Sequence, residues 1–195
     1  MQQSQKRMAS VYLITLLLLL GWIASANAGG KGYYETGELE FEETYVNGKL
    51  EGERVEYYKN KQVRAKIPYK NSKKEGIEKR FHENGKLQLE IEYVDNLPQG
   101  ISKLFFDDGS VQAETPYKDG KMHGVSKRYY KSGKLQYKAE YVDNKVEGPA
   151  VSYYEDGAVQ RQDNYVNGKR EGVSKEFYPS GKLKAEFTYK NDLLH

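Results

Sequence analysis

The chain has 195 residues, with 31 Lys and Arg against 28 Asp and Glu, and it contains no cysteine. The lack of cysteine excludes disulfides, a thiol nucleophile, cysteine-ligated zinc and the lipid-modified cysteine of a bacterial lipoprotein. The near balance of charge argues against a nucleic-acid partner, because proteins that bind nucleic acid concentrate positive charge on one face.

Residues 1–28 have the pattern of a signal peptide. Lys6 and Arg7 precede an apolar run of about 13 residues, and Ala26-Asn27-Ala28 has small residues at the two positions that a signal peptidase reads. The run is shorter than the roughly 20 residues of a transmembrane anchor, which is the alternative. We expect cleavage after Ala28, which leaves 29 basic and 28 acidic residues. The expected location is a bacterial periplasm or the space outside the cell.

After a short linker expected at residues 29–32, one tyrosine recurs seven times at intervals of 24 residues. The seven are Tyr45, Tyr69, Tyr93, Tyr117, Tyr141, Tyr165 and Tyr189. A spacing kept this strictly indicates that one small structural unit has been copied and stacked. If units are counted from Tyr33, residues 33–195 hold seven of them, and the last is truncated.

Each unit is predicted to be an antiparallel hairpin. In residues 87–93, apolar residues alternate with Gln and Glu, which is the period of a half-buried β-strand. A second short strand is expected to run from the late Gly of each unit into the pair of aromatic residues, as in residues 77–82. A three-residue loop ending in a Gly such as Gly85 suits the positive φ of that position. In this register the first aromatic residue pairs with the Leu or Val six places later.

Two consequences of this register are expectations about packing. All apolar positions should share one face of the sheet. Lys61 replaces the loop Gly of the second unit, so Asn60-Lys61 must either adopt positive φ or form a different turn, and this hairpin should be the weakest. The predicted fold is therefore all-β: an elongated antiparallel meander sheet of stacked 24-residue β-hairpin repeats, in which each unit contacts only its neighbours.

The units resemble MORN repeats, and more closely the variant form found in YwqK-family antitoxin modules. The resemblance rests on the aromatic–aromatic–x–x–Gly segments and on the Gly–Lys–x–x–Gly segments at residues 48–52, 120–124 and 168–172. It covers residues 33–195, although these units are slightly longer than the ordinary MORN unit and lack its Trp. The resemblance implies the hairpin sheet. It also implies a role as a scaffold, a lipid-associated module or a toxin-neutralising partner.

The residues of a catalytic site are not found in the sequence. There is no nucleophile elbow, no phosphate-binding Gly–Lys–Ser/Thr loop and no His–Glu–x–x–His motif. His82, His123 and His195 occupy three different places of the repeat and lack the spacing of metal ligands. We therefore expect no enzyme activity, no metal and no cofactor.

Two sets of residues are candidates for binding a partner. The second aromatic residue of each unit is expected to project from the polar face, either as a binding strip or as a row that stiffens the sheet: Tyr34, Tyr58, His82, Phe106, Tyr130, Tyr154 and Tyr178. The other set interrupts the apolar rows with charge, at Glu43 in the first unit and at Arg161 and Asp163 in the sixth. Such charges either improve solubility or provide specific contacts.

The sequence favours an exported, non-enzymatic binding protein. The first hypothesis is an immunity or antitoxin protein that neutralises a toxin encoded nearby through protein–protein contact. The alternative is an envelope scaffold or a phospholipid-associated module. The near-neutral mature chain argues against strong electrostatic attachment to anionic lipid, so a membrane is the secondary partner.

Overall fold

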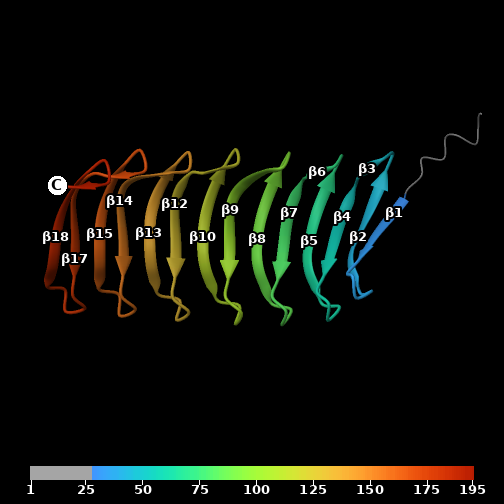
Figure 1. Ribbon diagram of the computed structural model, residues 1–195, viewed down its shortest axis with the longest axis horizontal. Helices are drawn as coiled ribbons and strands as arrows, with labels where there is room; N and C mark the ends of the chain where they lie inside the picture. Colours follow the sequence, from blue (N-terminus) through green and yellow to red (C-terminus); the bar gives the residue numbers. More distant parts are fainter. Residues whose placement is uncertain (1–27) are drawn as a thin grey trace, which may run out of the picture.

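The computed structural model describes residues 28–195, which form one open antiparallel sheet of 19 strands (Figure 1). The strands are β1 (Ala28–Tyr33), β2 (Leu39–Val46), β3 (Lys49–Leu50), β4 (Gly52–Tyr57), β5 (Val63–Lys70), β6 (Lys73–Lys74), β7 (Gly76–Phe81), β8 (Leu87–Val94), β9 (Leu97–Phe105), β10 (Val111–Lys118), β11 (Lys121–Met122), β12 (Gly124–Tyr129), β13 (Leu135–Val142), β14 (Lys145–Tyr153), β15 (Val159–Val166), β16 (Lys169–Arg170), β17 (Gly172–Phe177), β18 (Leu183–Lys190) and β19 (Leu193–Leu194). The predicted elongated meander is confirmed. No helix of membrane-spanning length occurs among the described residues.

The first strand of the sheet lies where a linker was expected. Residues 29–32 belong to β1, which pairs with β2 through partners such as Gly30 with Glu43 and Gly32 with Phe41. β1 therefore occupies the place that β4 or β7 occupies in later units. The linker assignment is wrong because Gly-rich sequence reads as flexible, whereas here the neighbouring strand supplies the hydrogen bonds. The predicted signal peptide, Ala28 apart, lies outside the described residues.

The predicted hairpin register is confirmed in all seven units. The first aromatic residue pairs with the Leu or Val six places later, from Tyr33 with Leu39 to Phe177 with Leu183. The loop ends in a residue with positive φ, which is Gly except at Lys61, where φ is 69°. These loops line the lower edge of the sheet in Figure 1.

A β-bulge beside each loop corrects the expected arrangement of faces. Phe81 pairs with Leu87, but Arg80 pairs with Leu89, so Gln88 has no partner and the bulge places Leu87 and Leu89 on opposite faces. The expectation that all apolar positions share one face is therefore wrong. Tyr129 illustrates the result, because its hydroxyl donates to Glu114 on the face opposite the repeat tyrosines.

The other edge of the sheet is a ladder of two-residue turns. Asn47 and Gly48 both have positive φ, as a type I′ turn requires, and each later unit repeats this pair of φ values. Successive turns are hydrogen-bonded to each other, as where Ser72 donates its N–H to the Leu50 carbonyl. The stacked turns add hydrogen bonds between units that the strands do not provide.

The sheet has two distinct faces, named here by their most regular residues. The tyrosine face carries the seven repeat tyrosines, every second residue before them and the cross-strand partners of all these, including Ile91, Arg128 and Asp163. Most repeat tyrosines lie opposite a Gly, as Tyr93 lies opposite Gly76. The lysine face carries the intervening residues, including Lys79, Lys103, Lys127 and Lys138.

The most buried side chains form one row across the middle of the tyrosine face. This buried row includes Ile67, Glu78, Ile91, Ser102, Ser126, Ala139, Ala150 and Ser174, each at most 8 % exposed. Within residues 28–195 no second layer covers the row, so its shielding comes from neighbours on the same sheet. The composition of the row changes along the sheet, and this change defines the candidate site.

Candidate binding surface on the tyrosine face

In the N-terminal part of the tyrosine face, the charged side chains form ion pairs with one another. Arg54 binds Glu43 at 2.6 Å through Nη1 and Glu56 at 3.1 Å through Nε. In the next unit, Glu78 is 1 % exposed and accepts hydrogen bonds from Lys74 at 2.6 Å and Arg80 at 2.7 Å. The charges here are satisfied within the chain. The predicted charge at Glu43 is therefore part of an internal network.

The charged side chains in the C-terminal part of this face are paired in the same way. Arg161 contacts both carboxylate oxygens of Asp163, at 2.7 and 2.9 Å, and Glu176 at 2.9 Å. Ser174 donates to Asp163 at 2.7 Å. Burial acts to raise the pKa of Asp163, but the hydrogen bonds from Arg161 and Ser174 outweigh it and lower that pKa. The two charges predicted to contact a partner thus bind each other within the sixth unit.

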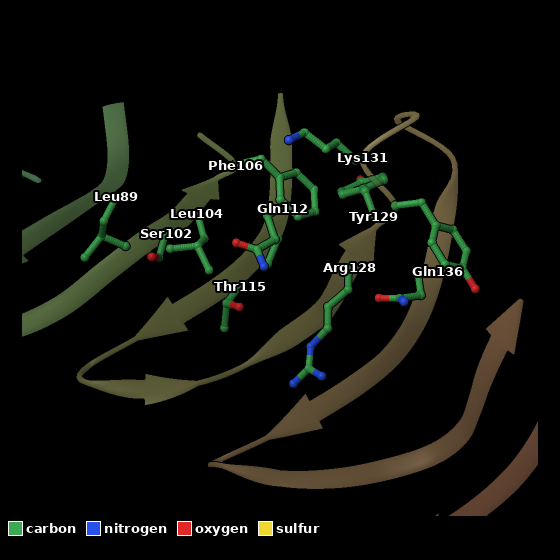
Figure 2. Close-up of a pocket in the computed structure, with 12 residues that line it drawn as sticks. Leu89, Ser102, Leu104, Phe106, Gln112, Thr115, Arg128, Tyr129, Lys131 and Gln136 are labelled. Atoms are coloured by element: carbon green, nitrogen blue, oxygen red, sulfur yellow. The ribbon is translucent and has the colours of Figure 1, made fainter. Parts of the chain in front are cut away.

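Between the two networks lies an open hollow of about 720 Å³, shown in Figure 2. The hollow is formed by β8, β9, β10, β12, β13 and the loops that follow β9 and β12. Its lining includes the apolar side chains Leu89, Leu104, Ala113 and Phe106, and the amides of Gln112 and Gln136. Thr115 occupies the repeat position that Asp163 has in the C-terminal network, and Ser102 occupies the position that Glu78 has in the N-terminal network.

Arg128 is the charged residue of the hollow that has no acidic partner. Every other arginine in residues 28–195 has a carboxylate within 4.0 Å, whereas Arg128 has none. Its guanidinium lies 5.8 Å from the ring centroid of Tyr137. Burial and the neighbouring tyrosines raise the pKa of Tyr137 to about 12, so this phenol stays neutral and supplies no negative charge. Arg128 is exposed to solvent.

The predicted aromatic strip is largely a hydrogen-bonded ladder. Five of its members bond to the backbone carbonyl of the first aromatic residue in the next unit, at 2.7 to 3.0 Å: Tyr34, Tyr58, His82, Tyr130 and Tyr154. This arrangement favours the interpretation that the row stiffens the sheet. Phe106 has no hydroxyl, and Tyr178 is 49 % exposed.

The strip also lies on a different face from the one expected. Phe106 and Tyr130 line the hollow together with Leu104 and Arg128, which belong to the tyrosine face. Tyr154 likewise lies beside Arg161. The bulge is again the reason. It reverses the alternation of the second strand beside the loop, so Leu135 and its partner Tyr129 lie on the lysine face, and the next residue, Tyr130, returns to the tyrosine face. The structure thus brings two predicted strip residues to the hollow and leaves Arg161 and Asp163 outside it.

The described histidines are dispersed and do not form a metal site. His82 is bonded to the Phe105 carbonyl, and His123 Nδ1 lies 3.7 Å from Asp143. Within residues 28–195, no three His, Asp or Glu side chains are arranged to hold a metal ion. Chemically, the hollow offers one cation without an acidic partner, two amides and an apolar floor, which suits binding.

The repeat architecture and the family comparison agree. The model of the MORN repeat variant matches residues 30–47, 50–71, 74–95, 98–119, 122–143, 146–167 and 170–191, which is well over half of the chain. The chain belongs to the MORN repeat variant family. A comparison with curated proteins finds no match. MORN repeat proteins are generally binding modules rather than enzymes, and the tyrosine face of these MORN repeats has a surface suited to binding.

Arg128 was missed by the sequence analysis, which examined charges only on the second strand of each hairpin. The signal was present on the first strand. Arg80 and Arg128 occupy the same place of the repeat, 48 residues apart, but the residue two positions earlier is Glu78 in one unit and Ser126 in the other. Comparing first strands in this way identifies the unpaired arginine.

Proposed function

We propose that this protein is a non-enzymatic binding module that takes a protein partner on its tyrosine face, centred on the hollow beside Arg128. One observation carries the proposal: the internal ion pairs at both ends of this face stop at the hollow, where an exposed arginine stands without a carboxylate above an apolar floor. Aromatic, arginine and aliphatic groups around a central recess are typical of the residues that dominate binding energy at protein interfaces.

The specific form of the proposal is an exported immunity or antitoxin protein. Two sequence features support it: the signal-peptide pattern of residues 1–28 and the resemblance of the units to YwqK-family antitoxin modules. An extended, internally braced sheet is also a suitable surface for covering a toxin, because a rigid surface loses little conformational entropy on binding.

The test combines a co-purification experiment with a growth assay. The tagged full chain is co-expressed with the product of the adjacent gene, and we expect the two to co-purify. The adjacent gene product is then exported alone, and we expect it to stop growth unless this protein is also present. A neighbour that is harmless when exported alone removes the immunity hypothesis, even if the two proteins bind.

The lysine face supports a second candidate, an envelope scaffold or a phospholipid-associated module. Ile101 and Val125 are 59 % and 47 % exposed there, close to Lys103 and Lys127. Exposed aliphatic groups beside lysines suit a lipid headgroup region. In a flotation assay with phosphatidylglycerol vesicles, this candidate predicts binding that weakens when Lys103 and Lys127 are both changed to Gln.

A further inference from the structure

Two units of the repeat differ in whether their arginine has a carboxylate partner. Arg80 and Arg128 occupy the same repeat position, at the same place on the tyrosine face. Arg80 receives its carboxylate from Glu78, two residues earlier on the same strand, at 2.7 Å. In the Arg128 unit that residue is Ser126, whose hydroxyl donates only weakly to the Glu114 carbonyl at 3.3 Å. One unit therefore carries a complete ion pair, and the other carries half of one.

We infer that the missing carboxylate comes from a partner: the hollow binds an Asp or Glu side chain of a protein segment, next to an aliphatic or aromatic side chain of that segment. This inference rests on the proposed function and names the chemistry of its partner. The guanidinium of Arg128 matches a carboxylate through paired N–H donors. The floor of Leu89, Leu104 and Ala113 accepts the neighbouring apolar side chain.

The rim of the hollow favours a protein carboxylate over a phosphate-bearing lipid surface. Lys131 lines the hollow, but its ammonium is already bound to Asp107 at 2.8 Å and lies 3.7 Å from Asp108. The rim therefore places two carboxylates beside one lysine and repels a densely anionic surface. The amides of Gln112 and Gln136, in contrast, provide donors and acceptors for the backbone of a bound segment.

The comparison between units also suggests a substitution that would give Arg128 a carboxylate partner within the chain. Ser126→Glu places a carboxylate where Glu78 stands relative to Arg80. The cross-strand neighbour of Ser126 is Ala139, whereas that of Glu78 is the larger Ile91, so the longer side chain has room. The variant should pair Arg128 internally and exclude the partner while keeping the fold. Ser126→Ala is its matched control, because it alters the same atom without adding charge.

The probe is a phage-displayed library of random 12-residue peptides, selected on the purified full-length protein. We expect enriched peptides that carry Asp or Glu beside an aliphatic or aromatic residue. Their affinity should fall about ten- to a hundredfold in Arg128→Gln and in Ser126→Glu, the range for a lost charge-assisted hydrogen bond. Ser126→Ala and Lys127→Gln should bind as the wild type does, because Lys127 neighbours Arg128 but points to the lysine face.

Any of four results would overturn the inference: no peptide is enriched, the enriched peptides lack an acidic residue, Ser126→Glu binds them as well as the wild type does, or Arg128 is required for binding to phosphatidylglycerol vesicles and not to peptides. Urea unfolding of each variant checks that a lost affinity is not a lost fold. The proposed function is tested separately. If acidic peptides bind at Arg128 but the adjacent gene product does not bind, the inference is supported and the immunity-protein hypothesis is rejected.

Discussion

The internal ion pair of the sixth unit makes a quantitative prediction about stability. Asp163→Asn keeps the shape of the side chain but removes its charge. In the wild type, the carboxylate accepts two bonds from Arg161, at 2.7 and 2.9 Å, and one from Ser174 at 2.7 Å. Its side chain is 12 % exposed. Hydrogen bonds to a charged group each contribute about 1.5–3 kcal/mol.

The expected loss is smaller than the sum of these bonds. Arg161 keeps its bond to Glu176 at 2.9 Å, and its side chain is 29 % exposed, so water partly replaces the lost carboxylate. Removing one partner of a fully buried pair costs about 3–5 kcal/mol. For this half-buried pair we expect the free energy of unfolding to fall by about 2 kcal/mol at pH 7. The measurement is urea unfolding followed by circular dichroism.

The pH dependence tests the cause of that loss. The pKa of Asp163 is lowered in the folded protein, so its contribution is complete above the ordinary pKa of an Asp, about 4. The contribution is lost as the pH falls from about 4 through the lowered value. Wild type and Asp163→Asn should therefore converge at low pH. Equal stabilities at pH 7, or a constant difference down to about pH 2, would show that the ionised Asp163 carboxylate does not provide this stability.

Three further substitutions test the repeat itself, each by urea unfolding. Lys61→Gly should raise the free energy of unfolding by about 0.5–1 kcal/mol, because a left-handed backbone strains Lys but not Gly; an unchanged value would mean that φ of 69° is not strained. Phe106→Tyr should raise it by about 1 kcal/mol through a new bond to the Tyr129 carbonyl, and no gain would mean that the ladder geometry is not shared. Gly76→Ala should lower it by about 1–2 kcal/mol, because φ is 106° and the new Cβ would lie 3.3 Å from Pro68; full stability would contradict this.

Much of the fold was predictable because the local signals repeat. A Gly ends six of the seven three-residue loops and indicated the hairpin register, and this many copies made a chance pattern implausible. The type I′ turns were readable in principle at Asn47-Gly48, where both residues favour positive φ. In Asn71-Ser72 the same turn carries a residue that rarely adopts it, so the general rule was hidden.

The faces were harder to predict than the register. A bulge adds one residue, here Gln88, and reverses the alternation without any distinctive residue type to mark it. The sequence therefore placed Leu87 and Leu89 on one face, and it placed Phe106 on the polar face. The hollow was missed for the same reason, because its lining combines residues from both sides of a bulge.

The charged candidates show a second limit. Arg161 and Asp163 stood out because they interrupt an apolar pattern. Such a pattern does not distinguish two charges that bind a partner from two charges that form an ion pair with each other. Their spacing of two residues on one strand was the available clue, since it places both on one face. Arg128 was less conspicuous, and its importance depends on what is missing at Ser126.

Chemical footprinting can show directly whether a partner binds the tyrosine face at Arg128. The complex and the free protein are treated with phenylglyoxal for arginine and with an acetylating reagent for lysine, and both are read by mass spectrometry. Arg128 and Lys127 are neighbours on β12 that point to opposite faces. We expect the partner to protect Arg128 and to leave Lys127 reactive. Protection of Lys127 with Arg128 still reactive would contradict this expectation.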